Sequence, residues 1–196
     1  MQLLIVSGFL GSGKSTFIIE VAKEAAKREI KTAILVNEIG EIGIDDQFMR
    51  QLGLNVWEIL GGCICCTLAA DLNTTLDNLI RDYKPDIVLL EPSGAADLRS
   101  VNQIVSGYEE RSALRIRRIT IVDPLRLQMM MEVLTPLVTS QIKSADLILI
   151  NKADAASTEE MAYARQTVRE LHPNVEVLSL SAKDSLEPAL FDGLVL

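Results

Sequence analysis

The sequence is poor in the residues that mark disulfide-bonded, membrane-spanning or nucleic-acid-binding proteins. It has only three cysteines, all within residues 63–66, and three thiols in four positions cannot form an ordinary disulfide framework. No uninterrupted apolar stretch approaches the ~20 residues that a helix needs to cross a bilayer. The 19 basic residues are outnumbered by 27 acidic ones, and the net charge of −8 opposes binding to a nucleic-acid backbone. We therefore expect a protein of a reducing compartment, with no membrane and no nucleic acid among its partners.

Aromatic residues are also scarce, which favours an aliphatic core. They make up 4% of the 196 residues, against 48% hydrophobic and 23% charged residues, and these proportions exclude the disordered and fibrous classes. The chain is long enough for one well-buried domain and too short for two of ordinary size. It shows no internal repeat and no linker. We expect a single domain over residues 1–196.

Short apolar runs alternate with amphipathic stretches along the whole chain. The runs are typical of β-strands and lie at residues 3–6, 32–36, 56–60, 87–90, 119–122, 147–150 and 175–180. The stretches are typical of helices and lie at residues 16–29, 68–83, 98–110, 125–143 and 158–171. Because the strands read as continuous Ile, Val and Leu runs, the alternation predicts an α/β fold of three layers, a mainly parallel sheet with helices on both faces. Ligands of such a sheet bind at the carboxyl ends of its strands.

A phosphate-binding motif follows the first predicted strand. Residues 8–15 read GFLGSGKS and match the pattern GxxxxGK[ST], with a helix predicted directly behind them. The glycines let the backbone turn its N–H groups toward phosphate oxygens, and the helix directs its positive end at the same anion. Lys14 adds charge at the β- and γ-phosphates, and the Ser15 hydroxyl is a candidate ligand of Mg²⁺. The candidate nucleotide-binding residues of this segment are Gly8, Gly11, Ser12, Gly13, Lys14, Ser15 and Thr16.

Two segments after later strands point to guanine. One predicted strand runs directly into NKAD at residues 151–154, and another is followed by SAK at residues 181–183. The carboxylate of Asp154 can accept from both the ring N–H and the exocyclic amine of guanine, whereas adenine offers no such pair of donors. With these segments the chain resembles the P-loop GTPases. The resemblance implies that five further residues brace the phosphate loop, cover the base or contact the guanine oxygen: Asn151, Lys152, Ser181, Ala182 and Lys183.

The carboxylate on the Mg²⁺ side is expected at another strand end. The predicted strand at residues 87–90 runs into EPSG, which resembles the DxxG switch of GTPases with glutamate in place of aspartate. Glu91 would hold Mg²⁺ through water and the Gly94 N–H would sense the γ-phosphate, so both join Lys14 as catalytic candidates. Asp123, also at a strand end, is a second carboxylate candidate. Ala95 stands where a Ras-like enzyme has the glutamine that orients water, so we expect slow intrinsic hydrolysis of GTP to GDP and phosphate.

The cysteines lie in a segment that suits a transferable metal ion. Cys63, Cys65 and Cys66 belong to GGCICC at residues 61–66, between a predicted strand and the next helix. Three soft ligands so close together suit Zn²⁺, Cu(I) or another thiophilic metal, but a structural zinc site usually brings a second, separated ligand pair, and the sequence has none. The incomplete set fits an open or transferable site. The alternative is that the thiols are buried small hydrophobes behind the loop glycines.

Taken together, the motifs resemble the family of GTPases that includes CobW, UreG and HypB, most closely its CobW-like branch. The resemblance covers nearly the whole chain and rests on GFLGSGKST at 8–16, NEIGEIGID at 37–45, GGCICC at 61–66, EPSG at 91–94, QI at 141–142 with AD at 145–146, and NKAD at 151–154. It implies Glu38 and Glu41 as further metal ligands or switch contacts, with a solvated acidic loop as the alternative. CobW-like proteins usually continue into a C-terminal domain. This sequence ends at residue 196, just after the predicted guanine-reading segment. We therefore expect either a minimal stand-alone GTPase that docks its client with its own switch surface, or a half that works with a separately encoded partner.

By that resemblance the protein would be a metallochaperone or cofactor-assembly GTPase that uses GTP and Mg²⁺. It would load Zn²⁺, Co²⁺ or Ni²⁺ into a client metalloenzyme or serve a corrinoid protein, as a homodimer or a nucleotide-dependent dimer. Hydrolysis would reset a switch whose two states differ in metal or client affinity. Two alternatives stay open: a regulatory GTPase that gates or reactivates a cofactor enzyme without carrying metal, and a small-molecule kinase, which gives no reason for NKAD. Since a cleaved N-terminal signal would destroy the phosphate loop, we expect a cytoplasmic protein.

The predicted helix at residues 125–143 leaves its own role open. Its apolar part, residues 125–137, suits an interface and a core equally well. The methionines at residues 129–131 are expected to provide flexible packing rather than a sulfur metal site.

Overall fold

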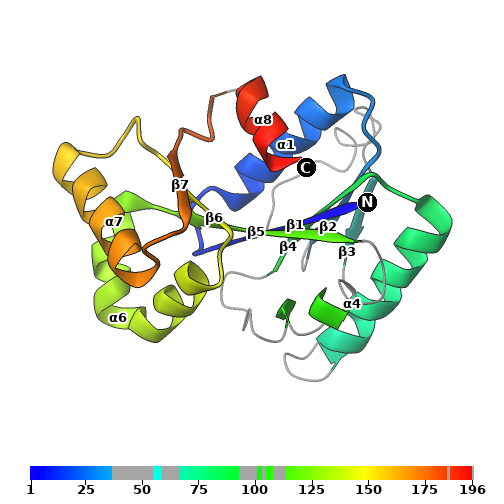
Figure 1. The fold of residues 1–196 in the computed structure, drawn as a ribbon, viewed down its shortest axis with the longest axis horizontal. Coiled ribbons are helices and arrows are strands. Elements are labelled where there is room, and N and C mark those ends of the chain that lie inside the picture. Colours follow the sequence, from blue (N-terminus) through cyan, green and yellow to red (C-terminus); the bar gives the residue numbers. More distant parts are fainter. Residues whose placement is uncertain are drawn as a thin grey trace.

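The computed structural model describes residues 1–36, 55–58, 67–92, 101–102, 105–107, 114–184 and 186–195. These residues form a seven-stranded sheet in the order β3-β2-β4-β1-β5-β6-β7 (Figure 1). Every neighbouring pair of strands is parallel. The predicted α/β class with a parallel sheet is confirmed.

Each predicted apolar run overlaps a strand. The strands are β1 (Gln2–Gly8), β2 (Thr32–Val36), β3 (Asn55–Glu58), β4 (Ile87–Glu91), β5 (Arg115–Val122), β6 (Leu147–Ile150) and β7 (Glu176–Ser179). The helices are α1 (Lys14–Lys27), α4 (Thr67–Asn78), α6 (Pro124–Lys143), α7 (Thr158–Leu171) and α8 (Pro188–Leu194), and α4 runs on into a π-helical segment, η1 (Leu79–Tyr83). Of the helix predicted at 98–110, residues 101–102 and 105–107 are helical, and the others lie outside the described residues.

Strand β1 lies between β4 and β5, and both of its faces are buried. Leu4 and Val6 belong to the core that α1 and α8 cover, whereas Leu3 and Ile5 belong to the core that α4 covers. The central positions of a parallel strand with helices on both sides are apolar on both faces, because neither face meets water. The continuous apolar run at residues 3–6 therefore fits the central position of β1 in the sheet.

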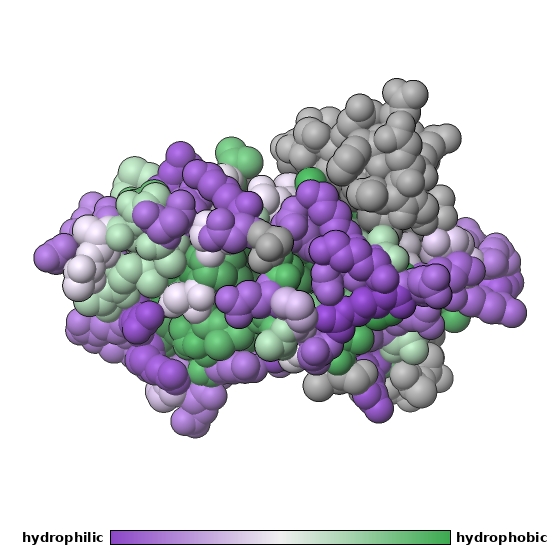
Figure 2. Space-filling view, turned by 90° about the horizontal axis from the view of Figure 1, so that it is seen from above, coloured by the Kyte–Doolittle hydropathy of each residue, from purple (hydrophilic) through white to green (hydrophobic). Residues whose placement is uncertain are grey.

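The helices form two layers, one on each face of the sheet. Helices α1 and α8 cover one face, and α4, α6 and α7 cover the other (Figure 1). The view onto the side of α1 and α8 shows hydrophobic residues gathered in one half of that surface, framed by hydrophilic ones (Figure 2). The three-layer architecture predicted from the sequence is confirmed.

The sequence patterns do not predict helix α8, which has only 7 residues. So short a segment shows too few turns for a helical period, and its stability comes from tertiary contacts. Phe191 is buried against α1, and the Arg28 guanidinium lies 4.5 Å from the centre of its ring. The Gln2 side chain donates to the Leu194 carbonyl at 2.7 Å, so the start of β1 and the end of α8 lie side by side.

Helix α6 breaks in its middle. Leu134 has non-helical backbone angles (φ −130°, ψ 32°), and Pro136 stands inside the helix without an N–H to donate. Leu127, Val138 and Ile142 are buried, whereas Val133 is 71% exposed. One side of α6 therefore packs into the core, and apolar residues on another side are not covered by any part of the chain that the structure describes. None of the helices that the structure describes combines the length and the apolar character needed to cross a membrane.

Candidate nucleotide-binding site

The phosphate-loop motif forms a tight turn at the carboxyl end of β1. Its three glycines all have positive φ: Gly8 at 142°, Gly11 at 76° and Gly13 at 100°. A Cβ atom at Gly8 would lie 2.5 Å from the Ile121 carbonyl oxygen, so the backbone of β5 leaves no room for a side chain there. Helix α1 starts at Lys14, directly behind the turn. The loop therefore presents backbone N–H groups and a helix N-terminus to the same space.

Asn151 joins this loop to the segment after β7. Its Nδ2 donates to the Ser12 carbonyl at 2.7 Å, and its Oδ1 accepts from the Ala182 N–H at 2.7 Å. Asn151 is 2% exposed, and a Cβ atom at Gly13 would clash with its amide nitrogen. One buried side chain thus joins two segments that lie far apart in the sequence, at Ser12 and at Ala182.

Lys14, Ser15 and Glu91 lie together beneath the loop. The Ser15 hydroxyl donates to Glu91 Oε1 at 3.3 Å, and Lys14 Nζ lies 3.7 Å from the same oxygen. Lys14 Nζ also donates to the Phe9 carbonyl at 3.3 Å. Both charged residues are buried, and together they are close to neutral. The hydroxyl and the carboxylate are hard oxygen donors of the kind that Mg²⁺ prefers, so this pair fits the ion expected beside the phosphates.

Asp123 and Lys152 form a second charged pair on the other side of the loop. Lys152 Nζ lies 2.6 Å from Asp123 Oδ2, and the other carboxylate oxygen accepts from the Leu125 N–H at 3.1 Å as the N-cap of α6. Asp123, the alternative carboxylate candidate for Mg²⁺, therefore accepts hydrogen bonds from a lysine side chain and from the N-terminus of α6. Lys152 has a positive φ of 61° and starts the turn that follows β6.

The candidate guanine-reading residues lie where β6 and β7 end. The Ala153 N–H donates to the Leu180 carbonyl at 3.2 Å, which holds the two segments side by side. Asp154 and Lys183 are exposed, Ser181 is half-buried and Ala182 is buried. Thr16, at the start of α1, is exposed.

Six of the predicted site residues lie outside the described residues, and the structure leaves those predictions as they stand. They are Gly94, Glu38, Glu41, Cys63, Cys65 and Cys66. Within the described part of the chain, the structure groups no three His, Cys, Asp or Glu side chains as a metal site.

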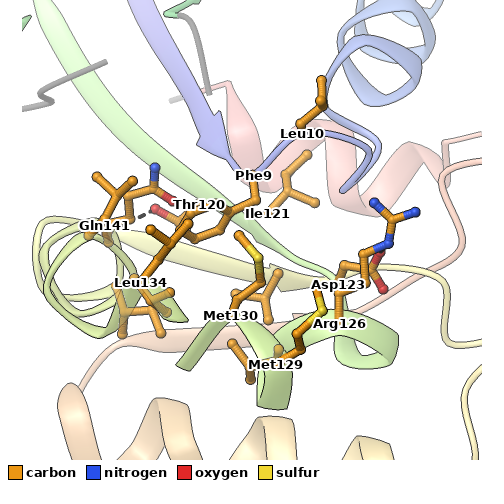
Figure 3. A pocket seen from close by; sticks show the side chains of 15 residues that line it. Phe9, Leu10, Thr120, Ile121, Asp123, Arg126, Met129, Met130, Leu134 and Gln141 are labelled. Carbon is orange, nitrogen blue, oxygen red and sulfur yellow. Dashed lines mark hydrogen bonds and ion pairs between the residues drawn. The ribbon is translucent and has the colours of Figure 1, made fainter. Parts of the chain in front are cut away.

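An apolar cavity, which no sequence pattern predicts, opens beside the phosphate loop. It has a volume of about 430 Å³ and lies between Phe9 and Leu10 of the loop and the side chains of Met129, Met130 and Leu134 from α6 (Figure 3). At its inner end, the Thr120 hydroxyl donates to the Gln141 carbonyl at 3.1 Å. Leu10 is 79% exposed and Met129 is 55% exposed.

One further basic residue reaches the loop. Arg126, near the start of α6, places its guanidinium against Gly11 and close to Asp123 (Figure 3). No motif marks this residue, because its place depends on how α6 packs against the loop.

The chain is similar to known proteins in sequence and in fold. Residues 2–179 match the family described as CobW/HypB/UreG, nucleotide-binding domain. The chain is 35% identical over 157 residues to the zinc chaperone YeiR of Escherichia coli, a match that covers 79% of this chain and 47% of YeiR. It is 30% identical over 223 residues to the zinc chaperone CobW of Pseudomonas aeruginosa, covering 97% of this chain and 59% of that protein. The chain spans about half the length of these curated relatives.

Solved structures share the fold. The Zn(II)-bound YjiA GTPase from Escherichia coli superposes with a TM-score of 0.69 at 23% identity, over 97% of this chain and 60% of YjiA. The hydrogenase maturation factor HypB from Archaeoglobus fulgidus superposes with a TM-score of 0.67 at 19% identity, over 99% of this chain and 88% of HypB. The match over residues 2–179 shows that the chain belongs to the CobW/HypB/UreG family and carries its nucleotide-binding domain.

Proposed function

We propose that this protein is a GTP-hydrolysing metallochaperone or metallocofactor-assembly protein. In this proposal the GTP and GDP states differ in affinity for a metal ion or for a client protein. The observation that carries it is the double contact of Asn151, which holds Ser12 on one side and Ala182 on the other. The loop that would hold the phosphates and the segment that would hold the base are thereby assembled around one buried amide.

The loop residues would bind the phosphates. Backbone N–H groups between Gly8 and Thr16 would surround the phosphate oxygens, and Lys14 would exchange its contact with the Phe9 carbonyl for the β- and γ-phosphates. Lys14 is buried, so its charge would act in a medium of low polarity, where attraction to a phosphate is stronger than in water.

Ser15 and Glu91 would hold Mg²⁺, Ser15 directly and Glu91 through water. When bound, the ion supplies positive charge that screens the β- and γ-phosphate oxygens from an attacking water. Glu91 ends β4 and leads into the segment that contains Gly94, so a change at the γ-phosphate would be passed to that segment. The Gly94 contact stays a prediction.

Asp154 would select guanine, with Lys152, Ser181, Ala182 and Lys183 around the base. Asp154 is exposed and so has a carboxylate free to meet the base edge. The Ala182 N–H is already held by Asn151, so its contribution would be to fix the segment rather than to bind the base.

Zn²⁺ is the cargo that the relatives favour. YeiR and CobW are named zinc chaperones, and the YjiA structure holds Zn(II). In this chain the cargo would be held by Cys63, Cys65 and Cys66, with Glu38 and Glu41 as further candidates. The proposal includes a client metalloenzyme, a dimer in at least one nucleotide state, a single domain and a cytoplasmic location.

The test is the stoichiometry and affinity of Zn²⁺ binding to the purified, reduced protein, with and without a non-hydrolysable GTP analogue. A Cys65→Ser, Cys66→Ser double variant is measured in parallel, with GTP binding as the check that it is folded. About one Zn²⁺ per monomer or per dimer, lost in the variant and changed in affinity by the analogue, supports the proposal.

Two results would contradict it in different ways. If no state binds Zn²⁺, Co²⁺ or Ni²⁺ while GTP binding is intact, a regulatory GTPase that acts by protein contact becomes the better account. If GTP does not bind, or if its γ-phosphate appears on a small molecule instead of as free phosphate, the GTPase assignment itself fails.

A further inference from the structure

The side chain of Arg126 lies against the phosphate loop, and the proposed mechanism gives this residue no role. A Cβ atom built on Gly11 would lie 3.1 Å from Arg126 Nη1 and 3.7 Å from its Cζ. The guanidinium therefore lies against the middle of the loop, at a residue whose missing side chain leaves room for it. Figure 3 shows Arg126 extending from the start of α6 toward this loop, beside Asp123.

Among the residues that the structure describes, the charged side chains around Arg126 leave a positive excess next to the loop. Asp123 Oδ2 lies 2.6 Å from Lys152 Nζ and 4.0 Å from Arg126 Nε. The single carboxylate of Asp123 thus faces two cations, and its short contact is with Lys152 rather than with Arg126. On the other side of the loop, Lys14 is matched by Glu91. An anion bound in the loop would meet the excess charge that Arg126 contributes.

Arg126 is also placed to move. Its side chain is 57% exposed, whereas that of Asp123 is 5% exposed. It lies close to the N-terminus of α6, a helix end that Asp123 caps. Because Asp123 caps the start of α6 and the Arg126 side chain is largely exposed, its N–H groups can turn from Asp123 to a phosphate without any change in the backbone.

We propose that Arg126 is a nucleotide-contacting residue that binds the β-phosphate of GTP and GDP from the α6 side of the loop. This inference rests on the proposed GTPase function. The middle of a phosphate loop surrounds the α- and β-phosphates, so a guanidinium at Gly11 is nearest to those groups. Arginine binds phosphate through two parallel N–H···O bonds, which lysine cannot form.

The contact would assist hydrolysis from within the same chain. When water attacks the γ-phosphorus, a new P–O bond forms and the bond from that phosphorus to the β–γ bridging oxygen breaks. The electron pair stays on GDP, and the proton from water ends on inorganic phosphate. Charge therefore grows on the β-phosphate as the bond breaks, and a cation there stabilises the transition state more than the bound substrate. The contact would supply part of the stabilisation of hydrolysis that Ala95, in place of the water-orienting glutamine of Ras-like enzymes, cannot supply.

The experiment compares Arg126→Ala and Arg126→Lys with the unmodified protein. A Lys143→Ala variant is the matched control, since it removes one positive charge from the exposed far end of the same helix. Dissociation constants for GTP, GDP and GMP are measured with Mg²⁺ present, together with single-turnover hydrolysis at saturating GTP. We expect Arg126→Ala to weaken GTP and GDP about 10-fold, to leave GMP within about 2-fold, and to slow hydrolysis about 10- to 100-fold, as for loss of a hydrogen bond to a charged group. Arg126→Lys should lie between the two, and Lys143→Ala should match the unmodified protein.

Three outcomes would overturn the inference. If Arg126→Ala binds and hydrolyses GTP like the control, Arg126 does not touch the nucleotide. If it weakens GMP as much as GTP and lowers the melting temperature, Arg126 only supports the loop. If the unmodified protein itself neither binds nor hydrolyses GTP, the proposed function fails, and the inference fails with it.

Discussion

Asn151 holds Ser12 through a 2.7 Å hydrogen bond to the Ser12 carbonyl, and this bond is buried. The same amide accepts from Ala182, so it uses both a donor and its acceptor on backbone groups of two different loops. Backbone groups that lose such a partner in a buried place cannot turn to water instead. The geometry of the phosphate loop therefore depends on the residue that opens the NKAD motif.

Asn151→Ala should destabilise the fold and the nucleotide site together. It would leave the Ser12 carbonyl and the Ala182 N–H without their partner, at a cost of about 2–4 kcal/mol for two buried groups. We expect a lower urea midpoint and a loss of GTP affinity of at least about 10-fold. Asn174→Ala, at an exposed asparagine before β7, is the control. Unchanged stability and affinity in Asn151→Ala would show that the amide does not organise the loop.

Gly13→Ala should prevent the loop from closing on Asn151. Gly13 has φ +100°, and an added Cβ would clash with the Asn151 amide. We expect a loss of stability of about 2 kcal/mol or more and no measurable GTP binding, from combined strain and overlap. Gly193→Ala in α8 is a matched control, because nothing lies within 4 Å of its Cβ position. A helical glycine replaced by alanine should gain about 0.5–1 kcal/mol. Equal melting temperatures for the two variants would contradict this prediction.

Glu91→Gln should raise the Mg²⁺ concentration that hydrolysis requires. The change keeps the shape of the side chain but removes the charge beside Ser15 and Lys14. Single-turnover hydrolysis is measured across a Mg²⁺ titration, and we expect the midpoint to rise about 10-fold or more, because a carboxylate binds the ion much better than an amide. Glu29→Gln, just after the other end of α1, makes the same charge change at an exposed site. The role of Glu91 would be refuted by coincident titration curves for the two variants.

Asp154→Asn should change the base that the site prefers. An asparagine amide donates one hydrogen bond and accepts another, which no longer matches the two donors of guanine but does match xanthine, with a carbonyl in place of the amine. We expect GTP affinity to fall about 10- to 100-fold and xanthosine triphosphate affinity to rise, measured by competition. Asp184→Asn, an exposed aspartate just after Lys183, should leave both affinities unchanged. A variant that still prefers GTP would place the base elsewhere.

Glu24 should make stability depend on pH in the acid range. Hydrogen bonds from Lys27 and Arg28 hold the pKa of the Glu24 carboxyl below its ordinary value of 4.5. A carboxyl whose folded-state pKa is depressed stabilises the fold above the ordinary value, and this stability is lost as the pH falls through the lower, folded-state value. The melting-temperature difference between the unmodified protein and Glu24→Gln should therefore shrink below about pH 4.5. The shrinkage should be weaker in a Lys27→Ala background, which removes the largest cause. A difference that stays constant with pH would contradict the assignment.

The sequence predicts the strands and the glycine turn after β1 well, because both are local patterns. The strand runs are continuous in Ile, Val and Leu. The glycines of the loop lie within eight residues of one another and have the positive φ angles that the turn requires. Asn151 could be assigned to the loop only through the resemblance, since no pattern shows that it reaches Ser12 and Ala182 at once.

What the sequence does not predict depends on contacts between distant segments. Asp123 was a candidate for Mg²⁺ because it ends a strand, but its nearest cation is Lys152, from the neighbouring strand end. Arg126 and Gly11 carry no shared motif, and they meet because the capped start of α6 lies against the loop. Helix α8 is too short to show a helical period in the sequence, and Phe191 packs it against α1.

The break in α6 divides that helix into two units of unequal local stability. Pro136 has no N–H to give to the carbonyl four residues before it, so the hydrogen-bond ladder is interrupted where Leu134 leaves helical geometry. The later half is anchored by Val138 and Ile142, whereas the earlier half carries the exposed Met129 and Val133. Amide hydrogens of the earlier half should therefore exchange with solvent through small openings that leave the later half protected. Asp123 lies at the start of the earlier half, so such openings would be felt first at Lys152 and at the loop.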